Sequence, residues 1–227
     1  MAVDAVIFDW GGTLTPWHTI DPAELWSGVC QPHFPPAEAA RYAAALVAAE
    51  DDLWQLSRTE QRSATMSQVF ERAGVPVTDA FLASYVRAWE PHTFTDPEAH
   101  ELLAYLGSRD VRIGVLSNTL WPRSWHEDVF RRDGVLDLID GAVYTSEIDW
   151  TKPHPEAFRA AMTAVGVPDP ARCVFVGDRP FDDVHGAQQA GLRAVLLPHS
   201  DVPAFASAVP DAVISRLADL RPLLAAW

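Results

Sequence analysis

Five polar residues that lie far apart in the chain could together bind a metal ion and a phosphoryl group. They are Asp9, Ser117, Lys152, Asp178 and Asp183. Carboxylate oxygens suit Mg²⁺, which proteins usually hold through one or two carboxylates together with waters and substrate phosphate. A hydroxyl and an ammonium can bind phosphoryl oxygens and neutralise charge that develops on them. The residue types therefore predict phosphoryl chemistry, provided that the fold brings the five together.

Lys152 is conspicuous because it is the only lysine among the 17 basic residues of the chain. The other 16 basic positions are all arginine, and position 152 alone is lysine. A compact ammonium with three donors suits a site that must touch several oxygens at one point, where a planar guanidinium does not fit. We interpret Lys152 as a functional residue. The alternative is that a single lysine occurs here by chance in an arginine-rich composition.

The elements that must position these residues alternate between strands and helices. Apolar segments rich in β-branched residues predict strands over 3–8, 111–117, 141–145, 172–178, 192–197 and 211–215. Helices are expected over 96–107, with Asp96 as N-cap, over 154–166 and 182–191, and at the C-terminal end. This alternation predicts an α/β fold with a doubly wound, Rossmann-like parallel sheet. In such a sheet the carboxyl ends of the strands share one edge, so Asp9, Ser117 and Asp178 should converge there.

Residues 15–92 differ from the rest because their apolar positions follow helical spacing throughout. One amphipathic face includes Tyr42, Leu46 and Leu53, and two more lie over 66–73 and 81–89. We expect two parts: residues 1–14 and 93–227 form the α/β core, and residues 15–92 form an inserted helical cap. Most aromatic residues of the cap are expected to pack in its interior.

The composition excludes several partners. A net charge of −14 and a pI near 4.8 argue against binding to nucleic acid or to an anionic membrane surface. No basic N-terminal region precedes the first apolar run, and no run approaches the roughly 18 apolar residues of a membrane span. Cys30 and Cys173 give no disulfide framework. We expect a cytoplasmic protein, monomeric or homodimeric, that binds a small molecule.

The order of these features resembles the haloacid dehalogenase superfamily, whose members share four short motifs. The matching segments are FDWGGTL at 8–14, LSNT at 116–119, TKPHPEAF at 151–158 and GDRPFDDVHGAQQAG at 177–191. The resemblance covers the whole predicted core, and residues 15–92 occupy the position of the family's helical cap. It implies a hydrolase, in the first place a phosphatase that uses Mg²⁺ and acts on a small phosphorylated metabolite.

The family's residue roles follow from the motifs. Asp9 matches the nucleophile that accepts the phosphoryl group as an aspartyl-phosphate, which splits one difficult step into two. Ser117 and Lys152 match the groups that bind the phosphoryl oxygens. The resemblance further implies substrate contacts at Gly12, Thr13 and Asn118, and a metal site made by Asp9, the carbonyl of Gly11, Asp178 and Asp183.

One position departs from the family pattern. Family phosphatases usually carry a second aspartate two residues after the nucleophile, as general acid and base, and here that residue is Gly11. The loss of a positioned acid or base costs about 10²–10⁴ in rate. His18, Asp21 and His33 lie early in the expected cap and are candidates to replace it, although a surface position is the simpler expectation for each.

Alternative activities follow from the same resemblance. Family dehalogenases work without a metal, carry tyrosine where Gly11 stands and generally lack the Gly177-Asp178 pair. Phosphonate-cleaving relatives need a cap lysine, and residues 15–92 contain none. A phosphomutase would need the missing acid most. Two alternatives to a phosphatase therefore stay open. One is a dehalogenase-type hydrolase of carbon–halogen bonds, and the other is a non-catalytic protein that binds metal and phosphate.

Overall fold

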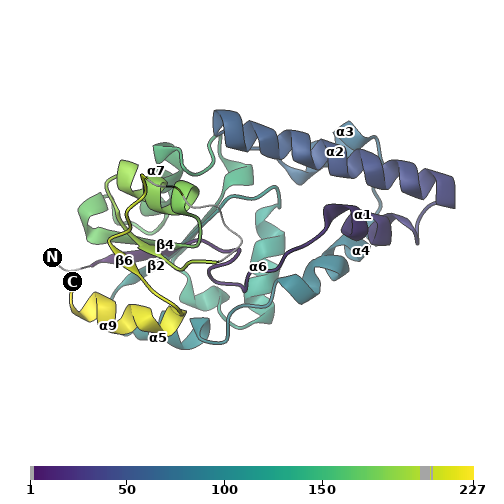
Figure 1. Cartoon of the computed structure of the whole chain (residues 1–227). Helices are drawn as coiled ribbons and strands as arrows, with labels where there is room; N and C mark the ends of the chain where they lie inside the picture. The colour runs from purple at the N-terminus through teal and green to yellow at the C-terminus, as the bar shows by residue number, and fades with distance from the viewer. Residues whose placement is uncertain (1–2, 200–204, 206) are drawn as a thin grey trace.

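The computed structural model describes residues 3–199, 205 and 207–227, and its centre is a parallel β-sheet (Figure 1). The strands are β1 (Ala5–Phe8), β2 (Arg112–Ser117), β3 (Gly141–Tyr144), β4 (Cys173–Gly177), β5 (Arg193–Leu196) and β6 (Ala212–Val213). Their order across the sheet is β3-β2-β1-β4-β5-β6. The first strand therefore lies in the middle, where Phe8 pairs with Val115 on one side and with Val176 on the other.

Helices cover both faces of the sheet, as a doubly wound fold requires. Val6 and Phe8 of β1 pack with α5 (Ala99–Gly107) and α9 (Leu220–Ala225) on one face. Ala5 and Ile7 point the other way and pack with α7 (Pro155–Ala164) and α8 (Gly186–Gln189). Figure 1 shows α5 and α9 below the sheet and α7 above it. The strand is buried on both faces, which is why its sequence is continuously apolar. The predicted fold class is confirmed.

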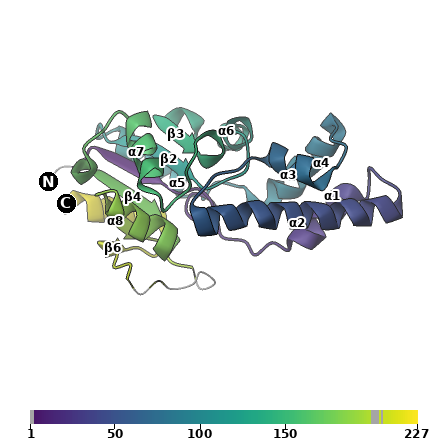
Figure 2. The ribbon, with the colours of Figure 1, turned by 90° about the horizontal axis from the view of Figure 1, so that it is seen from above.

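A second apolar cluster lies beside the sheet. The helices α1 (Pro22–Cys30), α2 (Pro36–Glu60), α3 (Met66–Ala73) and α4 (Asp79–Trp89) pack around it. Seen from above, the long helix α2 extends well away from the strands (Figure 2). Leu120 and Trp121, from the loop after β2, join this cluster and so connect it to the sheet. Within the described parts of the chain, no helix combines the length and the apolar character needed to cross a membrane.

Local signals set the ends of these helices. Thr65 and Gln68 form a reciprocal capping box at the start of α3, and Gly74 ends it in a left-handed conformation with φ of 61°. The helix expected from Asp96 begins later, at Ala99. The N–H of Asp96 donates to the carbonyl of Leu14, and its side chain accepts from the N–H of Glu98, so a turn precedes the helix.

Two further segments differ from the sequence expectation. The helix α6 (Arg123–Arg132) was not expected, because only His126 and Phe130 of its ten residues are buried and its apolar periodicity is weak. The helix expected over 182–191 is a π-helix at Pro180–His185 followed by the short α8. Single π-turns occur frequently at functional sites, and this one carries Asp183.

Candidate active site

Lys152 lies at the centre of the site and contacts two carboxylates. Its Nζ lies 2.5 Å from Oδ1 of Asp9 and 2.7 Å from Oδ1 of Asp183. The lysine side chain is 2% exposed. Burial alone favours the neutral amine, but the charges of Asp183 and Asp9 outweigh it and raise the pKa of Lys152 above its usual value. The residue is therefore a fixed ammonium between Asp9, at the end of β1, and Asp183, in the π-helix that follows β4.

Asn118 positions Lys152 through its main chain. The side-chain amide of Asn118 donates to the carbonyl of Lys152 at 2.9 Å, and its Oδ1 accepts from the N–H of Lys152 at 2.8 Å. The loop after β2 thereby fixes the segment that precedes α7. The side-chain amide of Asn118 thus fixes the main chain at Lys152. The expected contact between Asn118 and a substrate stays a prediction.

Asp178 is a buried carboxylate that lacks a partner. It follows β4 directly, is fully buried, and neither of its oxygens has a hydrogen-bond partner within the described part of the chain. Burial, followed by the charges of Asp9 and Asp183, raises the pKa of Asp178 to about 8. An unpaired buried carboxylate is costly, so this arrangement is one that a bound cation would stabilise.

The three acids form a cluster that fits a divalent cation. One carboxylate oxygen from each of Asp9, Asp178 and Asp183 lies within 4.8 Å of the others. Burial raises the pKa of Asp9 more than Lys152 lowers it. An all-oxygen set of carboxylates suits Mg²⁺, and a cation would relieve the repulsion among them. The three carboxylates expected to bind the metal are therefore brought together, and the expected contact of the Gly11 carbonyl stays a prediction.

The turn after β1 requires one of its two glycines. Gly12 has a φ of 88°, and a Cβ atom there would lie 2.7 Å from Oδ2 of Asp178. Its carbonyl accepts from Nε2 of His199 at 2.5 Å, with the histidine assigned as donor. Gly11 has no left-handed φ, and a Cβ atom there would meet nothing within 4 Å. The backbone therefore needs glycine at position 12 but accepts a side chain at position 11.

A cavity of about 540 Å³ opens above these residues. On the core side its wall includes Asp9, Gly11, Ser117, Asn118 and Lys152. Ser117 ends β2 and is 3% exposed. Gly12 and Thr13, both expected to bind substrate, do not line this cavity, and Thr13 is buried in the turn with its hydroxyl unpaired among the described residues. Their substrate contacts stay predictions.

Two charged residues at the core side of the cavity could not be singled out from the sequence by residue type alone. In the fourth motif Arg179 directly follows Asp178 and Asp182 directly precedes Asp183, and the charged groups of Arg179 and Asp182 are 4.0 Å apart. Burial, followed by the charge of Asp183, raises the pKa of Asp182 to about 6. The guanidinium of Arg179 lies 5.5 Å from the ring centre of Trp17 at the cavity wall. Their position beside expected metal ligands was the signal that could have identified them.

The candidate replacements for an acid at position 11 contact other groups. His18 lies 2.8 Å from His92 through their Nδ1 atoms. Asp21 caps α1 by accepting from the N–H of Ala23, and His33 contacts the hydroxyl of Ser84. None of His18, Asp21 and His33 lines the cavity in the described structure. The structure therefore offers no replacement for an acid at position 11 among these three candidates.

Comparison with known proteins agrees with the site. A family model described as haloacid dehalogenase-like hydrolase matches residues 3–191. The chain is 34% identical to a phosphoserine phosphatase of Thermus thermophilus over 130 residues, which cover 57% of this chain and 50% of the relative. It is 32% identical to a glyceraldehyde 3-phosphate phosphatase of Methanothermobacter thermautotrophicus over 101 residues, 44% of this chain and 43% of the relative.

Solved structures extend the similarity to the whole chain. A 2-haloacid dehalogenase from Pseudomonas syringae superposes with a TM-score of 0.69 at 25% identity, with 99% of each chain covered. The curated phosphatases, in contrast, are matched over about half of their length or less. The fold is therefore shared with phosphatases and dehalogenases alike, and the chemistry of the site must distinguish the two.

Proposed function

Because the chain belongs to the haloacid dehalogenase-like hydrolases, we propose that this hydrolase is a magnesium-dependent phosphatase with Asp9 as its nucleophile. The observation that carries the proposal is Asp178, a fully buried carboxylate whose two oxygens have no partner in the described structure and lie beside Asp9 and Asp183. A hydrolase of carbon–halogen bonds needs no cation at this position, so an unpaired buried carboxylate there would lower its stability without serving its reaction. The phosphatase relatives support the same choice.

The metal would be held by Asp9, Asp178, Asp183 and the carbonyl of Gly11. When bound, Mg²⁺ would supply positive charge to the phosphoryl group and help to orient it toward the nucleophile. The protein supplies the remaining charge from Lys152, whose ammonium is fixed at the cavity floor. The hydroxyl of Ser117, which lines the same cavity, would donate to the same phosphoryl group.

The reaction has two displacements at phosphorus. In the first, a carboxylate oxygen of Asp9 forms a bond to phosphorus, and the bond from phosphorus to the leaving oxygen breaks. In the second, water attacks the aspartyl-phosphate, the bond from phosphorus to Asp9 breaks, and phosphate and the free carboxylate result. Lys152 stabilises the charge on the phosphoryl oxygens in both steps. Because position 11 has no carboxylate, a basic leaving group departs without a positioned acid.

We assign residues 1–14 and 93–227 to the catalytic core and residues 15–92 to a cap over the site. The cavity supports this division, because its walls combine residues from strand ends with residues from α2 and α4. The core thus provides the reacting groups and the cap provides contacts to the leaving group. The expected substrate is a small phosphomonoester.

The proposal is tested with purified protein and a panel of phosphomonoesters, with Mg²⁺ or with a chelator. We expect phosphate release that needs Mg²⁺ and that Asp9→Asn abolishes, whereas Asp52→Asn, an exposed control on α2, retains it. The same preparations are given 2-haloacids. Halide release in the presence of chelator would replace the proposal with a dehalogenase. Binding of Mg²⁺ and phosphate without turnover of any ester would replace it with a non-catalytic binder.

A further inference from the structure

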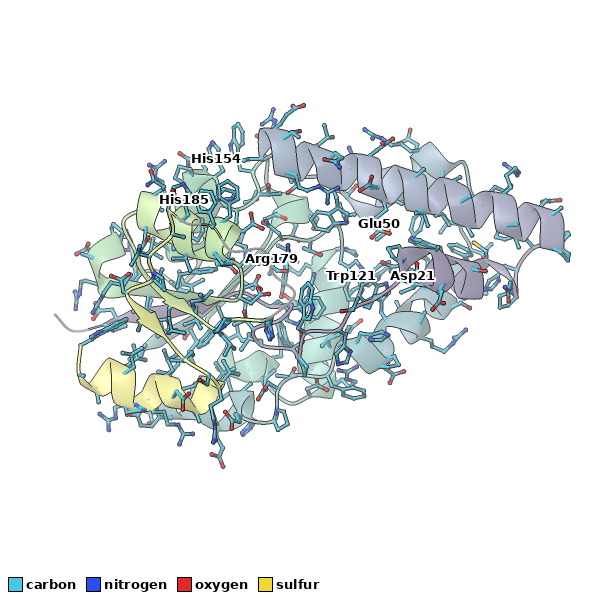
Figure 3. The ribbon with its side chains drawn as sticks, viewed as in Figure 1. Asp21, Glu50, Trp121, His154, Arg179 and His185 are labelled. Carbon is cyan, nitrogen blue, oxygen red and sulfur yellow. The ribbon has the colours of Figure 1, made fainter. Side chains whose placement is uncertain are left out.

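The cavity above Asp9 continues beneath α2, where its wall becomes aromatic. The aromatic lining residues on this side include Trp54, Tyr85, Trp89 and Trp121. Figure 3 shows Glu50 on the cap side beneath α2, with Trp121 nearer to Arg179 and the core. The volume of about 540 Å³ falls in the range of small-molecule sites. The two ends of the cavity therefore differ in chemistry.

Glu50 is the acid of this aromatic wall, and it has no cationic partner. Oε2 of Glu50 accepts from the indole N–H of Trp26 at 2.7 Å. Burial raises the pKa of Glu50, and hydrogen bonds from Trp26 and Trp54 oppose the shift. Among the described residues no lysine, arginine or histidine nitrogen lies within 4.0 Å of it. Arg58, which also lines the cavity, pairs with Asp51 instead.

The aromatic side chains around Glu50 are fixed before any ligand arrives. Tyr85 stacks on Trp26 with ring centres 4.7 Å apart, and it accepts a hydrogen bond of 2.9 Å from the indole of Trp121. Glu50 accepts a hydrogen bond from Trp26, and Trp26 is the ring that stacks on Tyr85, so the carboxylate lies at the edge of this stacked pair. Trp89 packs edge-on against Trp121. A carboxylate inside a rigid set of electron-rich rings attracts a cation by charge and by cation–π interaction.

We propose that this wall binds an ammonium group on the substrate's leaving group, so that the preferred substrates are phosphomonoesters of amino alcohols. The inference rests on the proposed phosphatase function and names its substrate class. The phosphate would lie against Lys152 and Arg179, and the ammonium against Glu50. Opposite charges at the two ends of one cavity would orient such a substrate in a single direction.

The first experiment needs no catalysis and no metal. Choline is titrated against the protein by tryptophan fluorescence, and its uncharged carbon analogue 3,3-dimethylbutanol is titrated in parallel. We expect choline to bind the unmodified protein at least about tenfold more tightly. Equal affinity for the two alcohols, or no binding of choline, would overturn the proposal without any variant.

A variant then asks whether the charge of Glu50 is responsible. Glu50→Gln keeps an oxygen that accepts from Trp26 but removes the charge, and Glu60→Gln is an exposed control on the same helix. We expect Glu50→Gln to abolish the preference for choline, whereas the control retains it. Circular dichroism and the thermal midpoint establish that both variants fold. A preference for choline that persists in Glu50→Gln would overturn the proposal.

Kinetics separate this inference from the proposed function. The ratio of kcat/KM for phosphocholine to that for 3,3-dimethylbutyl phosphate is measured with Mg²⁺ in the unmodified protein and in Glu50→Gln. We expect the variant to lower the ratio about tenfold or more, and comparing the ratios cancels the different acidity of the two alcohols. An equal loss on both esters indicates a structural role and overturns the inference. Selective choline binding without turnover of any phosphomonoester overturns the phosphatase and upholds the ammonium site.

Discussion

Gly11→Asp is the substitution that examines the missing acid most sharply. Gly11 has ordinary backbone geometry, and a Cβ atom there meets nothing within 4 Å, so an aspartate can be introduced without strain in the turn. The position faces the cavity beside Asp9. We therefore expect Gly11→Asp to fold with little change in thermal midpoint and to supply the proton donor that the unmodified site lacks.

The size of the effect depends on the leaving group. A positioned general acid contributes about 10²–10⁴ in rate, which corresponds to about 2.7–5.5 kcal/mol of activation free energy. An alkoxide needs the full contribution, whereas p-nitrophenolate leaves unprotonated. We expect kcat on an alkyl phosphate to rise by about 10², the lower limit, because the surroundings did not evolve around this carboxylate. Turnover of p-nitrophenyl phosphate should change only a few-fold.

The assay is steady-state phosphate release from the two esters by the unmodified protein and by Gly11→Asp. Gly12→Asp is the matched control, and it should lose activity on both esters because φ at Gly12 is 88° and a Cβ atom would collide with Asp178. Two results would refute the reasoning. Alkyl esters turned over by the unmodified protein as fast as aryl esters would mean that another group already acts as the acid. An equal gain on both esters would mean that the new carboxylate does not act by protonating the leaving group.

Three further perturbations follow from the burial of charged groups. Lys152→Met should abolish turnover and destabilise the fold by about 3–5 kcal/mol in urea unfolding, because Asp9 and Asp183 lose their shared cation, and an unchanged unfolding midpoint would contradict this. Asp178→Asn should raise the thermal midpoint of the chelator-treated protein but remove the increase that Mg²⁺ produces; a lower midpoint in chelator would show that the carboxylate has a partner after all. Burial, followed by the charge of Arg123, lowers the pKa of His126 to about 3, so below pH 6.5 the unfolded chain binds a proton that the folded chain does not. The free energy of unfolding should therefore fall by up to about 1.4 kcal/mol per pH unit from pH 6.5 toward pH 3, and His126→Gln should remove that part of the slope.

The fold and the convergence of polar residues at the core end of the cavity could be predicted from sequence, because each depends on local rules. Continuous β-branched runs identify buried parallel strands, and parallel strands place Asp9, Ser117 and Asp178 at one edge of the sheet. The rarity of lysine identified Lys152, which the structure places between Asp9 and Asp183. Neither inference needed knowledge of how the helices pack.

The other end of the cavity could not be predicted, because it depends on packing between distant segments. Glu50 follows a buried residue on an amphipathic helix, and nothing in its neighbours along the chain reveals that Trp26 donates to it. Trp121 lies in a loop after β2 and completes a cluster made otherwise by the helical segment. The helix α6 was missed for a related reason, since most of its residues are charged or exposed.

The central claim is that Asp9 carries the phosphoryl group during turnover. The protein is quenched with acid while it hydrolyses p-nitrophenyl phosphate in the presence of Mg²⁺. Any acyl phosphate is then reduced with borohydride, and the modified residue is located by peptide mapping. The account predicts homoserine at position 9 in the unmodified protein, with no modification and no turnover in Asp9→Asn. Homoserine at another aspartate, or an Asp9→Asn variant that hydrolyses the ester at a rate comparable to that of the unmodified protein, would contradict it.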